Sequence, residues 1–68
     1  LKSSGWRNAV SRDGTFITEY AKTSDQEDFA ESALFAYTLI FHPERFPEAD
    51  RTKIEQAIPN RIAFFREI

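Results

Sequence analysis

The stretch Tyr20-Ala-Lys-Thr-Ser-Asp-Gln-Glu-Asp-Phe-Ala-Glu31 decides how the chain is organised, because it reads as a loop that runs into the start of a helix. Ser24 followed three residues later by Glu27 is a capping box, in which the Ser24 hydroxyl accepts from the Glu27 N–H and the Glu27 carboxylate reaches back to the Ser24 N–H. Apolar residues recur at helical spacing through residues 25–41. The pattern therefore predicts a helix there, with Glu27 and Glu31 on one face of it.

The composition is that of one small globular domain. A chain of 68 residues buries only about 60% of its unfolded surface, so its core is small. The net charge is −2 and the nine basic residues are spread along the chain, which disfavours a nucleic-acid-binding surface. The chain has no cysteine, so it has no disulfide framework. It also has no long apolar run, which predicts no membrane span within these residues.

The fold class expected from these patterns is mostly α, with residues 1–24 irregular and residues 25–68 helical. Turn signals at Ser3-Ser4-Gly5 and Arg12-Asp13-Gly14 suggest the irregular segment, and the Asp-Gly pair can supply a residue with positive φ. Trp6 between the two turns is expected to anchor this segment on the core, since tryptophan is usually largely buried.

Two shorter helices are expected after the long one. Pro43 ends the helix 25–41, and Pro47 suits the first turn of a second helix that Pro59 interrupts. Residues 60–68 then read as a third helix. Its expected inward side chains are Ile62, Phe65 and Phe64, and its expected wetter side carries Arg61 and Arg66.

Part of this pattern resembles a known enzyme family. Tyr20-Ala21, Thr23-Ser24 and Glu27-Asp28-Phe29-Ala30-Glu31 resemble the second half of the active site in zinc metallopeptidases of the anthrax lethal factor type. These enzymes are gluzincins, whose third zinc ligand is a glutamate. The likeness continues through Asp50-Arg51-Thr52-Lys53-Ile54 and Ile58-Pro59, so it covers roughly residues 16–68. It implies the C-terminal helical subdomain of a zincin-like catalytic domain, with residues 1–68 as a single fragment of it.

The resemblance implies three site residues and one cofactor. Glu27 would be a ligand of Zn²⁺, and Tyr20 would donate to the oxyanion of the scissile carbonyl or protonate the leaving amine. Glu31 would hydrogen-bond a histidine ligand and fix its tautomer. The implied reaction is zinc-dependent hydrolysis of a peptide bond in a peptide or protein substrate.

Each of these residues also has a purely structural interpretation. Glu27 can serve only the capping box, Glu31 can be an exposed helix acid, and Tyr20 can be a half-buried loop tyrosine. Asp28 is expected to be a surface charge that complements the helix dipole. His42 is not expected to join Glu27 at a metal, because more than about 20 Å of helix separates them. It reads as a C-terminal cap.

One departure from the family is large. The His-Glu-x-x-His helix, which supplies two zinc ligands and the general base, does not occur in the chain. The chain is therefore expected to be inactive alone, and its start at Leu1 suggests a longer product with an upstream half. The alternative is a small helical protein–protein interaction module or a degenerate, non-catalytic relative. Localisation is not given by the sequence; the similar enzymes are often secreted.

The missing half has a consequence for the long helix. Its apolar residues form two adjacent stripes, and the two short helices can cover only one of them. The stripe around Ala30, Leu34 and Tyr37 is therefore expected to lack cover within the chain. It would contact either the missing half of the domain or a second copy.

Overall fold

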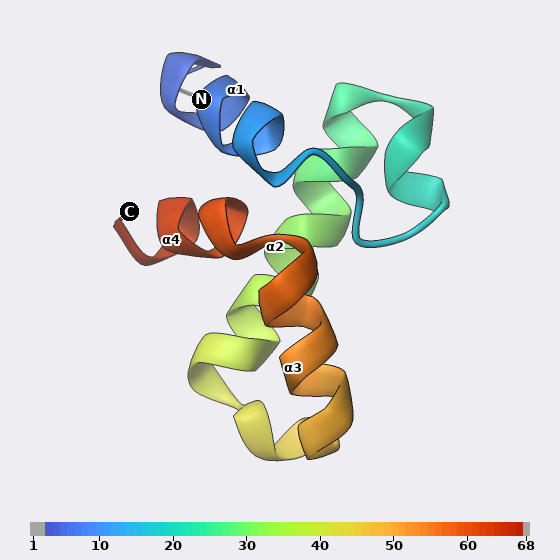
Figure 1. The fold of residues 1–68 in the computed structure, drawn as a ribbon, viewed down its shortest axis with the longest axis vertical. Coiled ribbons are helices and arrows are strands. Elements are labelled where there is room, and N and C mark those ends of the chain that lie inside the picture. The colour runs from blue at the N-terminus through green and yellow to red at the C-terminus, as the bar shows by residue number, and fades with distance from the viewer. Residues whose placement is uncertain (1–2, 68) are drawn as a thin grey trace.

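The computed structural model describes residues 3–67, which form four α-helices, two short 3-10 helices and no strand. Helix α2 runs through the middle of the molecule, and α1 and α4 lie together at one flank (Figure 1). Helix α4 packs against α1, α2 and α3, while η1 packs against α2. The expected mostly α class is therefore confirmed. The bounds in chain order are α1 Ser3–Asp13, η1 Tyr20–Thr23, α2 Asp25–Phe41, η2 Pro43–Arg45, α3 Glu48–Ala57 and α4 Pro59–Glu67.

The expectation that residues 1–24 are irregular is wrong for most of the segment. Residues 3–13 form helix α1, and η1 occupies Tyr20–Thr23. Trp6 and Ala9 lie three residues apart and are both buried, so α1 presents an apolar stripe to α4. Gly5 allows a close approach, because a Cβ there would lie 3.3 Å from the Phe64 ring. Gly14 then ends the helix with φ 67°, and its N–H donates to the Val10 carbonyl at 3.1 Å.

The long central helix has the bounds that the sequence predicts. Its first turn is capped by Ser24, whose hydroxyl accepts from the Glu27 N–H at 3.1 Å. It ends at His42, whose backbone N–H donates to the Thr38 carbonyl at 2.8 Å, as expected for a C-terminal cap. The buried face of α2 is made of small, polar and aliphatic residues: Asp28, Ser32, Ala36 and Leu39.

The two shorter helices have boundaries close to those predicted from the prolines: α3 begins directly after Pro47, and α4 begins at Pro59. Arg51 of α3 stabilises the connection between α2 and α3. Its guanidinium donates to the carbonyls of Pro43 at 3.0 Å and Phe46 at 2.9 Å. The main core gathers side chains from all four helices, and Trp6 is its hub, with edge-on contacts to Phe29 at 5.0 Å and Phe65 at 5.6 Å between ring centroids. The buried members are Trp6, Ala36, Leu39, Ile54, Ile58, Ile62 and Phe65.

A buried ion cluster ties three helices together and corrects two expectations. Arg61 is fully buried rather than on a wet helix face, and Asp28 is 2% exposed rather than a surface charge. The Arg61 Nη2 donates to Asp28 Oδ2 at 2.9 Å, and its Nη1 donates to Asp13 Oδ2 at 3.0 Å. Ser32 donates to the other oxygen of Asp28 at 3.1 Å. Arg61 thus joins the end of α1 to the first turns of α2 and α4.

Asp13 has a second role in the same cluster. Its Oδ1 accepts from the Asn60 backbone N–H at 2.8 Å, and its Oδ2 accepts from the Arg61 backbone N–H at 3.0 Å. These are N–H groups of the first turn of α4, which have no partner within their own helix. Asp13 therefore caps α4 from another helix, and no buried side-chain nitrogen or oxygen in the described part of the chain is left unpaired.

Candidate functional site

The candidate site lies where η1 meets the first two turns of α2. Tyr20 starts η1 and is 56% exposed, so its ring is accessible from solvent. Glu27 and Glu31 lie one helical turn apart on α2, and both are partly buried. η1 packs against α2, and this contact places the phenol beside the two acids. The structure thus brings together all three residues that the sequence singles out.

The Glu27 carboxylate lies close enough to the Tyr20 phenol to perturb its titration. The pKa of Tyr20 is raised above its usual 10.0, first by a hydrogen bond between its side chain and that of Glu27 and then by the negative charge of Glu27. Burial and the charge of Glu31 add smaller contributions in the same direction. The phenol is protonated at neutral pH, and the upward shift of its pKa extends the protonated range to higher pH. The interaction is lost only as the pH rises through the raised pKa.

Only half of the predicted capping box forms. The Ser24 hydroxyl accepts from the Glu27 N–H, but among the described residues Glu27 does not return a bond to the Ser24 N–H. The Glu27 carboxylate lies instead near the Tyr20 hydroxyl, whose pKa it raises. The cap therefore uses the backbone of Glu27 and leaves its side chain for another role.

Glu31 is held in place by the loop that precedes η1. Its Oε1 accepts from the Thr18 hydroxyl at 3.1 Å, and Thr18 Oγ1 in turn accepts from the Ala21 N–H at 3.0 Å. This chain of bonds ties η1 to the second turn of α2. Thr18 was not singled out in the sequence, and its position in a short β-branched run gave no signal for this contact.

The other acids and the histidine lie outside this cluster. Asp28 is buried and accepts from Arg61 instead. His42 caps the far end of α2, and its Nδ1 lies 3.5 Å from Glu44. Among residues 3–67, no group of three or more His, Cys, Asp or Glu side chains could hold a metal ion. The described residues therefore contain no complete zinc site.

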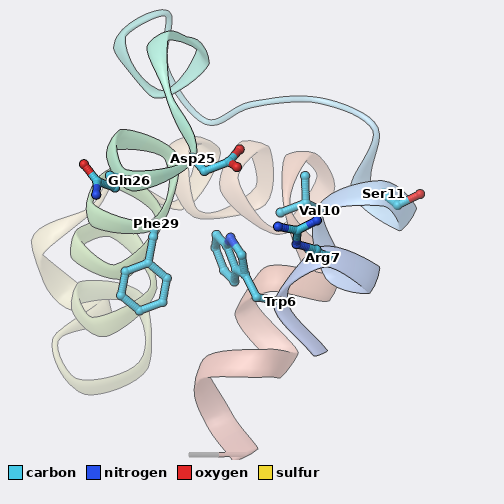
Figure 2. Close-up of a pocket in the computed structure, with 7 residues that line it drawn as sticks. All are labelled: Trp6, Arg7, Val10, Ser11, Asp25, Gln26 and Phe29. Carbon is cyan, nitrogen blue, oxygen red and sulfur yellow. The ribbon is translucent and has the colours of Figure 1, made fainter. Parts of the chain in front are cut away.

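A separate hollow of about 550 Å³ opens on another face of α2. In Figure 2, α1 contributes one wall of it and the first turns of α2 contribute the other, with the Trp6 indole between them. Neither Glu27 nor Glu31 lines it, so this hollow is not part of the candidate site. Its lining residues are Trp6, Arg7, Val10, Ser11, Asp25, Gln26 and Phe29.

The contact between Tyr20 and Glu27 predicts a measurable titration. In a Tyr37→Phe background, which leaves Tyr20 as the sole tyrosine, ultraviolet absorbance should give a pKa above 10.0 for Tyr20. Adding Glu27→Gln should lower this pKa, because the largest causes of the shift are removed. Glu31→Gln should lower it less. A Tyr20 pKa that does not respond to Glu27→Gln would contradict the contact.

None of the described helices is both long and apolar enough to cross a bilayer. Comparison of the chain with protein-family models, with curated proteins and with solved structures finds no match.

Proposed function

We propose that this chain is the part of a zinc-dependent endopeptidase that supplies the glutamate ligand and a tyrosine hydrogen-bond donor. The observation that supports the proposal is the arrangement of Tyr20, Glu27 and Glu31 at the start of α2. A protonated phenol faces a helix-borne carboxylate, and a second carboxylate follows one turn later. These are the three residues to which the resemblance to the lethal factor type assigns roles.

The residues of this chain can be compared with the usual ligands of a catalytic zinc ion. Catalytic zinc takes three protein ligands, of which a pair of histidines and one glutamate is a common set. Glu27 fits the glutamate position, because the cap of α2 uses only its backbone. The described residues provide no histidine pair, so another segment of polypeptide would supply the imidazoles. When bound, the metal would activate a water and polarise the scissile carbonyl.

The residues of this chain then have distinct tasks. The Tyr20 hydroxyl donates a hydrogen bond to the oxygen that becomes negative as the tetrahedral intermediate forms. A phenol whose pKa lies above 10.0 carries this proton at neutral pH. The Thr18 hydroxyl donates a hydrogen bond to one carboxylate oxygen of Glu31 and fixes its position one helical turn from Glu27. From there Glu31 can orient an imidazole.

Measuring both the rate and the zinc content of a Tyr20 variant distinguishes a role in the transition state from a role in metal binding. In the domain that carries the histidines, Tyr20→Phe should lower kcat and kcat/KM together by on the order of 10²-fold, because the lost bond is made only in the transition state. Zinc content should not change. Tyr37→Phe removes the same hydroxyl from the exposed tyrosine of α2, outside the candidate site, and is the matched control. An unchanged rate in Tyr20→Phe would contradict the proposed role.

A further inference from the structure

The end of α1 carries an aspartyl-glycyl sequence, Asp13-Gly14. The other aspartates, Asp25, Asp28 and Asp50, are followed by the bulkier Gln, Phe and Arg. In an unfolded chain the backbone nitrogen after an aspartate can attack the side-chain carboxyl. Glycine allows this attack most readily, because it has no Cβ and the widest choice of backbone conformations. Asp13-Gly14 is therefore the most reactive aspartyl bond of this chain once the chain is unfolded.

The reaction needs no reagent other than water. The Gly14 nitrogen forms a bond to Asp13 Cγ, and one carboxyl oxygen leaves as water with the amide proton and the carboxyl proton. Water then opens the resulting cyclic imide at either of its carbonyls. Opening at one carbonyl restores aspartate, and opening at the other gives isoaspartate, in which the backbone runs through the former Asp13 side chain.

The fold keeps both reacting groups apart. The Asp13 side chain is 0% exposed, and its oxygens accept four hydrogen bonds of 2.8 to 3.0 Å from Asn60 and Arg61. The attacking nitrogen is engaged as well, because the Gly14 N–H donates to the Val10 carbonyl at 3.1 Å. Asp13 is also the last residue of α1, and ring closure requires its ψ to leave helical values. These contacts must open before Cγ can reach the nitrogen.

We propose that Asp13-Gly14 is a modification site that reacts only when α1 separates from α4. The hydrogen bonds that protect the Asp13 carboxylate are the ones that join these two helices. Opening of the site and separation of the helices are therefore the same event. The folded chain then reacts only in proportion to the small fraction of molecules that are open. The reaction involves neither zinc nor the proposed peptidase site.

Isoaspartate at position 13 does not fit the contacts of the folded chain. It lengthens the backbone by one carbon and leaves the free carboxylate directly on Cα. That shorter carboxylate cannot reach both the Arg61 guanidinium and the first-turn N–H groups of α4, which the Asp13 carboxylate holds together. A chain that has reacted thus lacks the link between α1 and α4. Unfolding that lasts long enough for the reaction becomes irreversible.

The rate of isoaspartate formation in the folded and the unfolded chain tests the protection. The 68-residue chain is incubated at neutral pH in buffer and in concentrated guanidinium chloride. Isoaspartate is quantified by enzymatic methylation and located by peptide mapping. Asp13 should react at least about 100-fold more slowly in buffer, because few molecules are open there. Rates at Asp13 that agree within about threefold in the two conditions would overturn the proposal.

Arg61→Lys tests the protecting contacts under native conditions. A single ammonium cannot reproduce the forked contacts of the guanidinium, so Asp13 should form isoaspartate at least about fivefold faster in buffer than in the parent. Arg66→Ala, at an exposed position of the same helix, is the matched control and should stay within about twofold of the parent. An unchanged rate in Arg61→Lys would overturn the proposal.

Refolding tests the irreversibility. Chains that are incubated in guanidinium chloride and then diluted into buffer should divide into two fractions. The protease-resistant fraction should contain Asp13, and the protease-sensitive fraction should contain isoaspartate at this position. Gly14→Ala is the control, because its methyl group hinders ring closure; it meets no atom within 4 Å, and its cost comes from the positive φ of 67°. This variant should form little isoaspartate and refold after the same treatment. Isoaspartate in equal proportion in both fractions of the parent would overturn the proposal.

Discussion

Arg61→Ala is expected to lower the free energy of unfolding by about 3 to 5 kcal/mol, because it leaves the carboxylates of Asp13 and Asp28 buried without their cation. The Arg61 side chain is 1% exposed, and those of Asp13 and Asp28 are 0% and 3% exposed. Natural domains are stable by only about 5 to 15 kcal/mol, and a chain this small belongs at the low end. The variant should therefore keep at most about 2 kcal/mol of stability, and its unfolding midpoint in urea, followed by circular dichroism, should fall well below that of the parent.

Arg66 provides the control for this change. It lies on the same helix and is exposed, so Arg66→Ala should alter the stability by no more than about 0.5 kcal/mol in a urea titration. Arg61→Lys should fall between the two, because one ammonium cannot reproduce the forked contacts to Asp13 and Asp28. A loss of less than about 1 kcal/mol in Arg61→Ala would contradict the assignment of this cluster as the link between α1, α2 and α4.

Glu27→Ala is expected to abolish peptide hydrolysis in the complete domain while leaving α2 folded. The cap of α2 depends on the Glu27 backbone N–H, which alanine retains. The loss of the side chain removes a proposed zinc ligand and the partner of the Tyr20 hydroxyl together. Stability should therefore change little while activity falls to background. Glu48→Ala, at an exposed acid in the first turn of α3, is the matched control and should retain full activity.

The features that the sequence predicted correctly depend on local signals. The start of α2 follows from Ser24, and the end of α2 and both ends of α3 follow from prolines. The exposure of Leu34 and Tyr37 follows from an apolar stripe that two short helices cannot cover. Gly14 marks a positive-φ residue as expected, although it ends a helix rather than an irregular segment.

Helix α1 was missed because its stabilising contacts are distant in sequence. Its first residues are Ser-Ser-Gly, which favour turns when read locally. The helix forms because Trp6 packs against Phe64 and Phe65 and because Gly5 lets α4 approach. Such packing overrides weak local preference.

The buried ion cluster was missed for a related reason. The partners of Arg61 lie 33 and 48 residues away, and an arginine near a chain end is usually solvated. One signal was present: Arg61 lies in helical register with Ile58 and Phe65, which are both buried. A charged residue at an apolar position of this kind indicates a buried ionic partner. In the structure, Asp13 and Asp28 are these partners.

The central claim is that Glu27 is a zinc ligand, and the zinc content of the complete domain tests it most directly. Metal analysis after dialysis should give one zinc per domain for the parent and for Glu48→Ala, and much less for Glu27→Ala, because two histidines alone hold zinc weakly. The isolated 68 residues should bind zinc only weakly. Stoichiometric zinc in Glu27→Ala would contradict the claim, and would leave Glu27 as a helix-start acid and the chain as a helical interaction module.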